Sequence, residues 1–252
     1  MDNIETTYGG QFLWSTPIEY KTITLYPVLC KDLQMFYAGV YALLYDPIRY
    51  SGGISTLPRL YFLTDILNHQ DDDGAYIQQN MMLVQLFAQL GTLLALVFQE
   101  QKFEFVENKG RWFIRVYSNE EEYFDIKAKD FDIIREIILH QNGVDYDDTF
   151  VHEDIREWIA QQEASEKKSS ATLEDYMEVF MMQTGSCDIE VFKRVSLRRF
   201  NRMIDKILSR ENYTIQMTAS MSGFVTFKEK IDHWITINKK NSIYDKYFKE
   251  CK

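Results

Sequence analysis

Histidine, cysteine and acidic residues are the side chains through which this sequence could bind a metal ion or transfer a proton. The histidines are scattered, with none of the spacings of a zinc site: His69, His140, His152 and His233. The cysteines are far apart and form no CxxC pair: Cys30, Cys187 and Cys251. None of the motifs GxGxxG, GxSxG and HExxH occurs, nor does GxxxxGK followed by Ser or Thr. The sequence therefore predicts a non-enzymatic protein with no catalytic residue, no cofactor and no metal ligand.

Two acidic groups could still hold a divalent cation. The segment 71–74, DDDG, resembles a calcium loop, but an EF-hand with Gly74 at its sixth position requires an acidic residue where His69 stands and a glutamate where Asn80 stands. The second group precedes an expected helix, where acidic side chains also complement the positive helix terminus: Asp145, Asp147, Asp148, Glu153 and Asp154. We interpret both groups as solvated acidic segments.

Basic residues at one-turn helical spacing form the best candidate for a functional surface. The predicted partner surface comprises four of them: Arg198, Arg202, Lys206 and Arg210. In a chain of net charge −10, pairing with the protein's own acidic segments or with solvent is the first interpretation, and a protein partner is the second. Nucleic acid is the least favoured, because phosphate binding requires a predominance of positive charge.

Composition predicts which fold must position these residues. The chain has 252 residues, enough for one large or two small domains, and 46% of them are hydrophobic. Only 4 prolines and 11 glycines interrupt it, which favours long helices. The unpaired cysteines and an N-terminus without a basic, apolar leader predict reduced thiols and a cytoplasmic location. We expect an α+β, predominantly helical protein.

Hydrophobic periodicity places the elements of the N-terminal part. Alternating residues predict a strand at 20–26, and apolar spacing predicts helices at 31–46, 57–68 and 130–141. Residues 102–126 predict a small antiparallel meander with a turn at 107–110. On the helix at 31–46 an aromatic stripe is interpreted as core packing, with a partner groove as the alternative: Phe36, Tyr37, Tyr41 and Tyr45.

The segment 75–99 is the most apolar of the chain and is long enough to span a membrane. A thin polar stripe at helical spacing interrupts it: Gln78, Gln85, Gln89, Thr92 and Gln99. We therefore favour a buried helix or an oligomer interface over a membrane span.

The C-terminal part is more polar. The sequence predicts a helix at 151–166, an exposed linker at 167–170, a helix starting at Thr172 and a long helix at about 196–221. The predicted division is a first part, 1–143, with the meander, and a helical second part, 144–252.

Several phrases resemble a sequence type found in tailed phages of low-GC Gram-positive hosts. They are FDIIREII at 131–138, HQNG at 140–143, TLED at 172–175, SLRRFNR at 196–202 and TASMSGFVTFK at 218–228, together with YKTITLYPV at 20–28. The resemblance is to proteins encoded near the tail tape-measure gene, which act as tail-assembly chaperones or baseplate-hub assembly proteins.

This resemblance implies a non-enzymatic protein that binds a phage tape-measure or baseplate protein in the host cytoplasm, with no nucleic acid and no membrane. The methionines of the C-terminal part would suit such a partner: Met177, Met181, Met182, Met217 and Met221. A permanent component of the virion tail or baseplate is the first alternative, and an enzyme or a host-interaction protein is the second. A homo-oligomer stays open.

Overall fold

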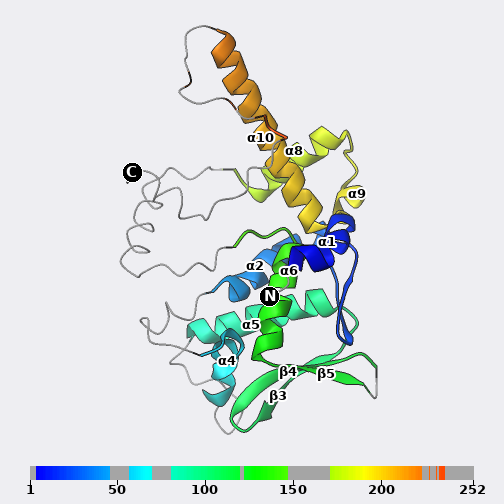
Figure 1. Ribbon diagram of the computed structural model, residues 1–252, viewed down its shortest axis with the longest axis vertical. Coiled ribbons are helices and arrows are strands. Elements are labelled where there is room, and N and C mark those ends of the chain that lie inside the picture. Colours follow the sequence, from blue (N-terminus) through cyan, green and yellow to red (C-terminus); the bar gives the residue numbers. More distant parts are fainter. Residues whose placement is uncertain are drawn as a thin grey trace, which may run out of the picture. The chain divides into compact units, whose positions relative to one another are not determined.

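The computed structural model describes residues 4–45, 57–69, 81–119, 122–146, 171–222, 227, 231 and 233–235. Helices predominate among them, with two small antiparallel sheets, so the predicted α+β, mainly helical class is confirmed (Figure 1). The expected helix at 151–166, the linker at 167–170 and the DDDG segment at 71–74 lie outside the described residues.

The chain forms two compact units, which are described separately. The first contains Met1–Asp145 and Phe192–Arg199, and the second contains Tyr146–Val191 and Phe200–Lys252. The sequence predicts a division into 1–143 and 144–252. The structure differs in that Phe192–Arg199, from the C-terminal half of the chain, belongs to the first unit.

The helices of the first unit gather around an apolar core. Their bounds are α1 (Ile4–Trp14), α2 (Leu33–Leu44), α4 (Arg59–Thr64), α5 (Met81–Phe98) and α6 (Ala128–Gln141), with short 3-10 helices η1 (Cys30–Asp32) and η2 (Asp65–His69). The helices α2 and α5 pack closely at Gly39, where an added Cβ would lie 2.9 Å from Leu93 Cβ and 3.0 Å from the Gln89 carbonyl oxygen. Glycine is therefore required at this crossing.

The helix α5 has a fully buried face and an open one. Leu83, Leu86, Leu90 and Leu93 are at most 2% exposed, whereas Met81 is 70% exposed. Among the described residues, α5 is also the helix that is long and apolar enough to cross a membrane, by length and composition alone. The absence of a membrane role stays a prediction.

A three-stranded antiparallel sheet lies in the same unit, at the bottom of Figure 1, with the order β3 (Phe103–Asn108), β4 (Arg111–Tyr117) and β5 (Tyr123–Ile126). This is the predicted meander. Lys109 and Gly110, with φ of 55° and 74°, form the two-residue turn between β3 and β4, as the twist of a hairpin favours. Ile114, Val116 and Ile126 point into the core and are fully buried.

The predicted single strand at 20–26 is a hairpin instead. It consists of β1 (Ile18–Tyr20) and β2 (Ile23–Leu25), with the turn residue Lys21 at φ 56°. The fold-back lets Ile18, Ile23 and Leu25 all reach the core, where each is fully buried. A continuous strand would not bring Ile18 back beside Leu25, its partner in the register.

The segment after the hairpin binds the returning chain. The Cys30 amide donates to the Val195 carbonyl (2.8 Å), and the Leu197 amide donates to the Val28 carbonyl (2.9 Å). These two backbone hydrogen bonds flank the bridge between Leu29 and Ser196. They attach Phe192–Arg199 to the first unit.

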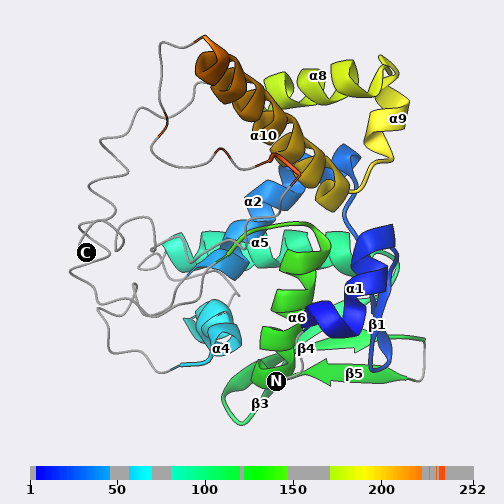
Figure 2. The ribbon, with the colours of Figure 1, turned by 45° about the horizontal axis from the view of Figure 1, so that its top comes forward.

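The second unit is helical where it is described. It contains α8 (Leu173–Thr184), most of the short α9 (Ile189–Lys193) and most of α10 (Leu197–Met221). Thr172 caps α8 in the predicted way: its hydroxyl accepts from the Asp175 amide, and the Asp175 carboxylate accepts from the Thr172 amide. Figure 2 shows α8 beside α10, where the Phe180 and Phe200 ring centroids are 5.5 Å apart.

Candidate partner surface on helix α10

The helix α10 is amphipathic because its apolar residues recur every three or four positions. Phe200, Ile204 and Ile207 are buried, with exposed fractions of 3%, 8% and 7%. Residues at this spacing share one face of a helix. The opposite face of α10 turns away from this buried side.

Three basic residues occupy that opposite face, and we call them the basic stripe: Arg202, Lys206 and Arg210. Their spacing of four residues aligns them along the helix. Arg202 and Arg210 are exposed and Lys206 is half-buried. All three belong to the second unit, so the whole stripe lies on one compact unit.

The hydrogen-bond acceptors of the basic stripe are neutral. Arg210 Nη2 donates to Gln183 Oε1 of α8 (2.7 Å), and Lys206 Nζ donates to the Ile235 carbonyl oxygen (3.5 Å). Across the described residues, no carboxylate lies within ion-pair distance of the three cations. The first interpretation was pairing with the protein's own acids or solvation. Of these, self-pairing is not seen in the described part of the chain, and solvation stays open for the exposed Arg202 and Arg210.

Arg198, the fourth residue of the predicted surface, lies elsewhere. It belongs to the first unit, where it donates a hydrogen bond to the His140 carbonyl and its guanidinium carbon lies 5.3 Å from the centre of the Phe12 ring. Phe12 in turn stacks on the His140 ring at 5.9 Å. Burial lowers the pKa of His140, and the nearby Arg198 charge lowers it further against the opposing effect of Glu5. Arg198 thus makes its contacts with residues of the first unit.

Beyond Ile207, apolar residues of α10 are exposed to solvent. Leu208, Ile215 and Met221 are 47%, 68% and 79% exposed. No charged residue follows Glu211 before the helix ends. Of the predicted methionine faces, Met182 on α8 is also largely exposed, at 78%, whereas Met177, Met181 and Met217 are partly covered.

The aromatic stripe of α2 is core packing only in part. Phe36 is fully buried, and Tyr45 stacks on Phe62 with centroids 5.8 Å apart. Tyr37 and Tyr41 are 41% and 54% exposed, so the core interpretation is wrong for these two residues. They lie one turn apart on the face of α2 that turns away from α5.

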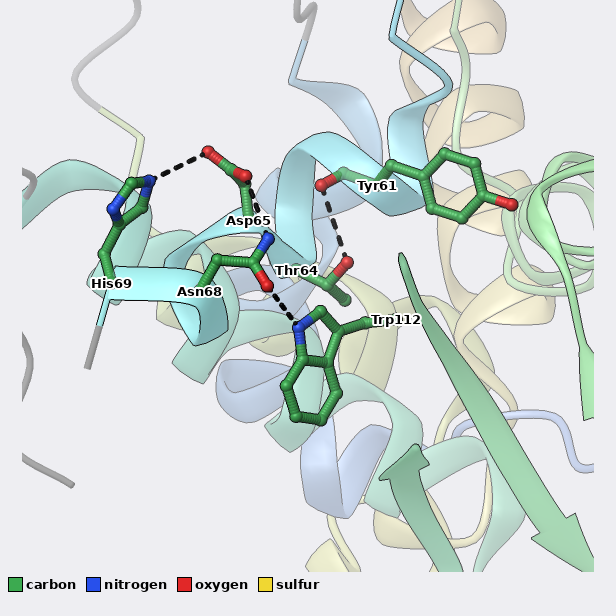
Figure 3. Close-up of polar contacts among 6 residues, drawn as sticks. All are labelled: Tyr61, Thr64, Asp65, Asn68, His69 and Trp112. Atoms are coloured by element: carbon green, nitrogen blue, oxygen red, sulfur yellow. Dashed lines mark hydrogen bonds and ion pairs between the residues drawn. The ribbon is translucent and has the colours of Figure 1, made fainter. Parts of the chain in front are cut away.

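A polar cluster around Trp112, drawn in Figure 3, joins η2 to β4. Trp112 Nε1 donates to Asn68 Oδ1 (2.8 Å), Asn68 Nδ2 donates to Asp65 Oδ1 (3.3 Å), and His69 Nε2 lies 3.4 Å from Asp65 Oδ2. The Thr64 hydroxyl donates to the Leu60 carbonyl (2.8 Å) and is not a free nucleophile. The arrangement is that of an anchored 3-10 helix, with the His69 ring beside the Asp65 carboxylate.

The other perturbed groups are structural. Burial raises the pKa of the Cys30 thiol to about 12, which keeps it protonated and unreactive. Burial favours the neutral form of Asp130, but hydrogen bonds from Lys21 and Tyr20 outweigh it and lower the pKa of this carboxyl. Within the part of the chain that the structure describes, no three His, Cys, Asp or Glu side chains gather as metal ligands. Most of the acidic group at 145–154 lies outside that part.

Residues 165–239 match the family model of the YomV second domain. The match includes α8, α9, α10 and the whole basic stripe, but less than a third of the chain. This family is phage-derived, of the type of YomV from Bacillus phage SPBc2, and the match indicates a phage protein. No curated protein and no solved structure matches the chain.

Proposed function

We propose that this protein is a non-enzymatic phage protein that binds a tape-measure or baseplate component during tail assembly, with α10 as the binding element. The observation that carries the proposal is the uncovered apolar face of α10 beyond Ile207. Leu208 and Ile215 continue the buried face of the helix but are exposed. An amphipathic helix with an open apolar side is a common means of binding another helix.

Two further observations support the proposal. The match to a phage domain family includes the whole of α10. The tail-assembly role itself rests on the sequence resemblance, and tape-measure proteins are long, apolar helical chains that suit an apolar helix face with methionines.

The test is co-expression of the full-length protein with the tape-measure and baseplate proteins of its own genome, followed by affinity capture and mass spectrometry. Ile215→Asp places a charge on the open apolar face, and Ser220→Asp places the same charge on another side of the same helix, at an exposed position. We expect the wild type and Ser220→Asp to capture a tail protein and Ile215→Asp to lose most of it. Failure of the wild type to capture any tail protein would refute the proposal.

Mass spectrometry of purified virions separates the two forms of the role. Recovery of the protein in virions identifies a permanent tail component, and recovery only in the capture identifies an assembly chaperone.

A further inference from the structure

The basic stripe carries positive charge that no described carboxylate neutralises through an ion pair. Its two hydrogen-bond acceptors, Gln183 Oε1 and the Ile235 carbonyl oxygen, have no formal charge. The described residues supply no carboxylate to any of its three cations. Acidic residues outnumber basic ones by 38 to 28 in the chain, yet among the described residues the stripe has no anionic partner, so an external anion is a candidate for that role.

The spacing of the stripe suits the side chains of another helix. Residues four apart on an α-helix are separated by about 6 Å along its axis. Carboxylates at the same spacing on a partner helix would repeat at the same interval, so each cation could face one carboxylate.

A polyphosphate fits the stripe less well. Three cations on one helix are few for a nucleic acid, whose affinity grows with the number of phosphates neutralised. The net charge of −10 also repels a polyanion at long range. A short acidic protein segment carries less charge and suffers less from that repulsion.

We infer that Arg202, Lys206 and Arg210 form the docking site for an acidic helical segment of the protein that α10 binds. This inference rests on the proposed function and specifies the chemistry of the partner: it carries a helical segment with carboxylates at four-residue spacing. It is a different segment from the one that meets Leu208 and Ile215, because those two side chains point to the opposite side of α10 from the stripe.

The first experiment is a titration of the 15N-labelled full-length protein, followed by NMR, with an alanine-rich helical peptide bearing glutamates at every fourth position. The control peptide has the same composition but its glutamates are spread around the helix. An oligothymidylate serves as the polyphosphate ligand. We expect the first peptide to shift the side-chain Nε–H signals of Arg202 and Arg210, and to do so more than the control peptide. The shifts should fade at high salt.

Two triple variants of the protein, each losing three positive charges, test whether the stripe is the binding site. Arg202→Gln/Lys206→Gln/Arg210→Gln removes the stripe, and Lys31→Gln/Lys109→Gln/Lys129→Gln removes three exposed lysines of the first unit. Exposed ion pairs each contribute a fraction of a kcal/mol, so loss of the stripe should weaken peptide binding by about tenfold. The control variant should bind as the wild type does.

Two results would overturn the inference: unchanged peptide binding by the stripe variant, and stronger shifts of Arg202 and Arg210 with oligothymidylate than with peptide.

The co-expression capture experiment shows whether the docking inference alone fails or the proposed function fails as well. If the wild type captures a tail protein and the stripe variant captures it equally well, the docking inference fails and the function stands. If the wild type captures none, the function fails, whatever the peptide shows.

Discussion

The close approach of α2 and α5 at Gly39 gives a prediction whose size can be worked out. A Cβ at this position would lie 2.9 Å from Leu93 Cβ, whereas carbon atoms in contact normally lie about 3.5 to 4.0 Å apart. Gly39→Ala therefore forces α2 and α5 apart by roughly 0.6 Å or more at a fully buried contact. Overpacking of this kind costs about 1–3 kcal/mol.

Gly91 supplies the matched control. It lies within α5, and an added Cβ there would meet nothing within 4 Å. Both substitutions gain about 1 kcal/mol of helix propensity. The difference between the two variants therefore isolates the steric term, and Gly39→Ala should be about 1–3 kcal/mol less stable than Gly91→Ala.

The assay is urea denaturation of both variants and the wild type, followed by circular dichroism. We expect Gly91→Ala to raise the midpoint of the transition and Gly39→Ala to lower it. Equal midpoints for the two alanine variants would show that α2 and α5 are not in close contact at Gly39.

Three further predictions concern single groups. Thr172→Ala removes the capping box of α8 and should lower the free energy of unfolding by about 1 kcal/mol, measured by urea denaturation. Iodoacetamide at neutral pH should alkylate the exposed Cys187 and leave Cys30 unmodified, because burial raises the pKa of Cys30 to about 12. Peptide mapping measures both, and alkylation of Cys30 in the folded protein would contradict this prediction. Because the pKa of Asp130 is lowered in the folded state, its ionised form stabilises the protein above the carboxyl's unfolded pKa, and this contribution disappears as the pH falls through the folded value. Asp130→Asn should therefore lower the melting temperature at neutral pH, and the difference in melting temperature from the wild type should shrink in acid. A difference that does not change with pH would show that the loss of stability does not come from the Lys21–Asp130 ion pair.

The elements that could be predicted from the sequence are those with a strong local period. The apolar spacing of 81–98 and 197–221 marks α5 and α10, and the Lys109-Gly110 turn marks the hairpin of β3 and β4. The helix α1 was not predicted, because IETTYGGQFLW contains two adjacent glycines and buries only Phe12. Its place depends on tertiary contacts that no local pattern reveals.

The candidate surface was predicted as a continuous row, and the structure separates one residue from it. Local spacing puts Arg198 in line with Arg202, Lys206 and Arg210. Its interaction with His140 joins residues 58 positions apart in the chain, so periodicity could not indicate it. The exposure of Ile215 was equally hidden, because an apolar residue in register with a buried face is expected to be buried.

The hydrogen bonds of Val28 and Cys30 with Leu197 and Val195 bear on how the protein is made. A ribosome releases the N-terminal hairpin early, but the strand-like partner of residues 28–30 emerges only after most of the chain has been synthesised. At ordinary rates of translation this interval is roughly 10 to 30 s. During that time the backbone groups of Val28 and Cys30 and the contact site for Arg198 on Phe12 stay open. The first unit therefore completes its folding late in synthesis, and a nascent chain stalled at Asp145 would expose an unpaired edge that chaperones or another nascent copy could bind.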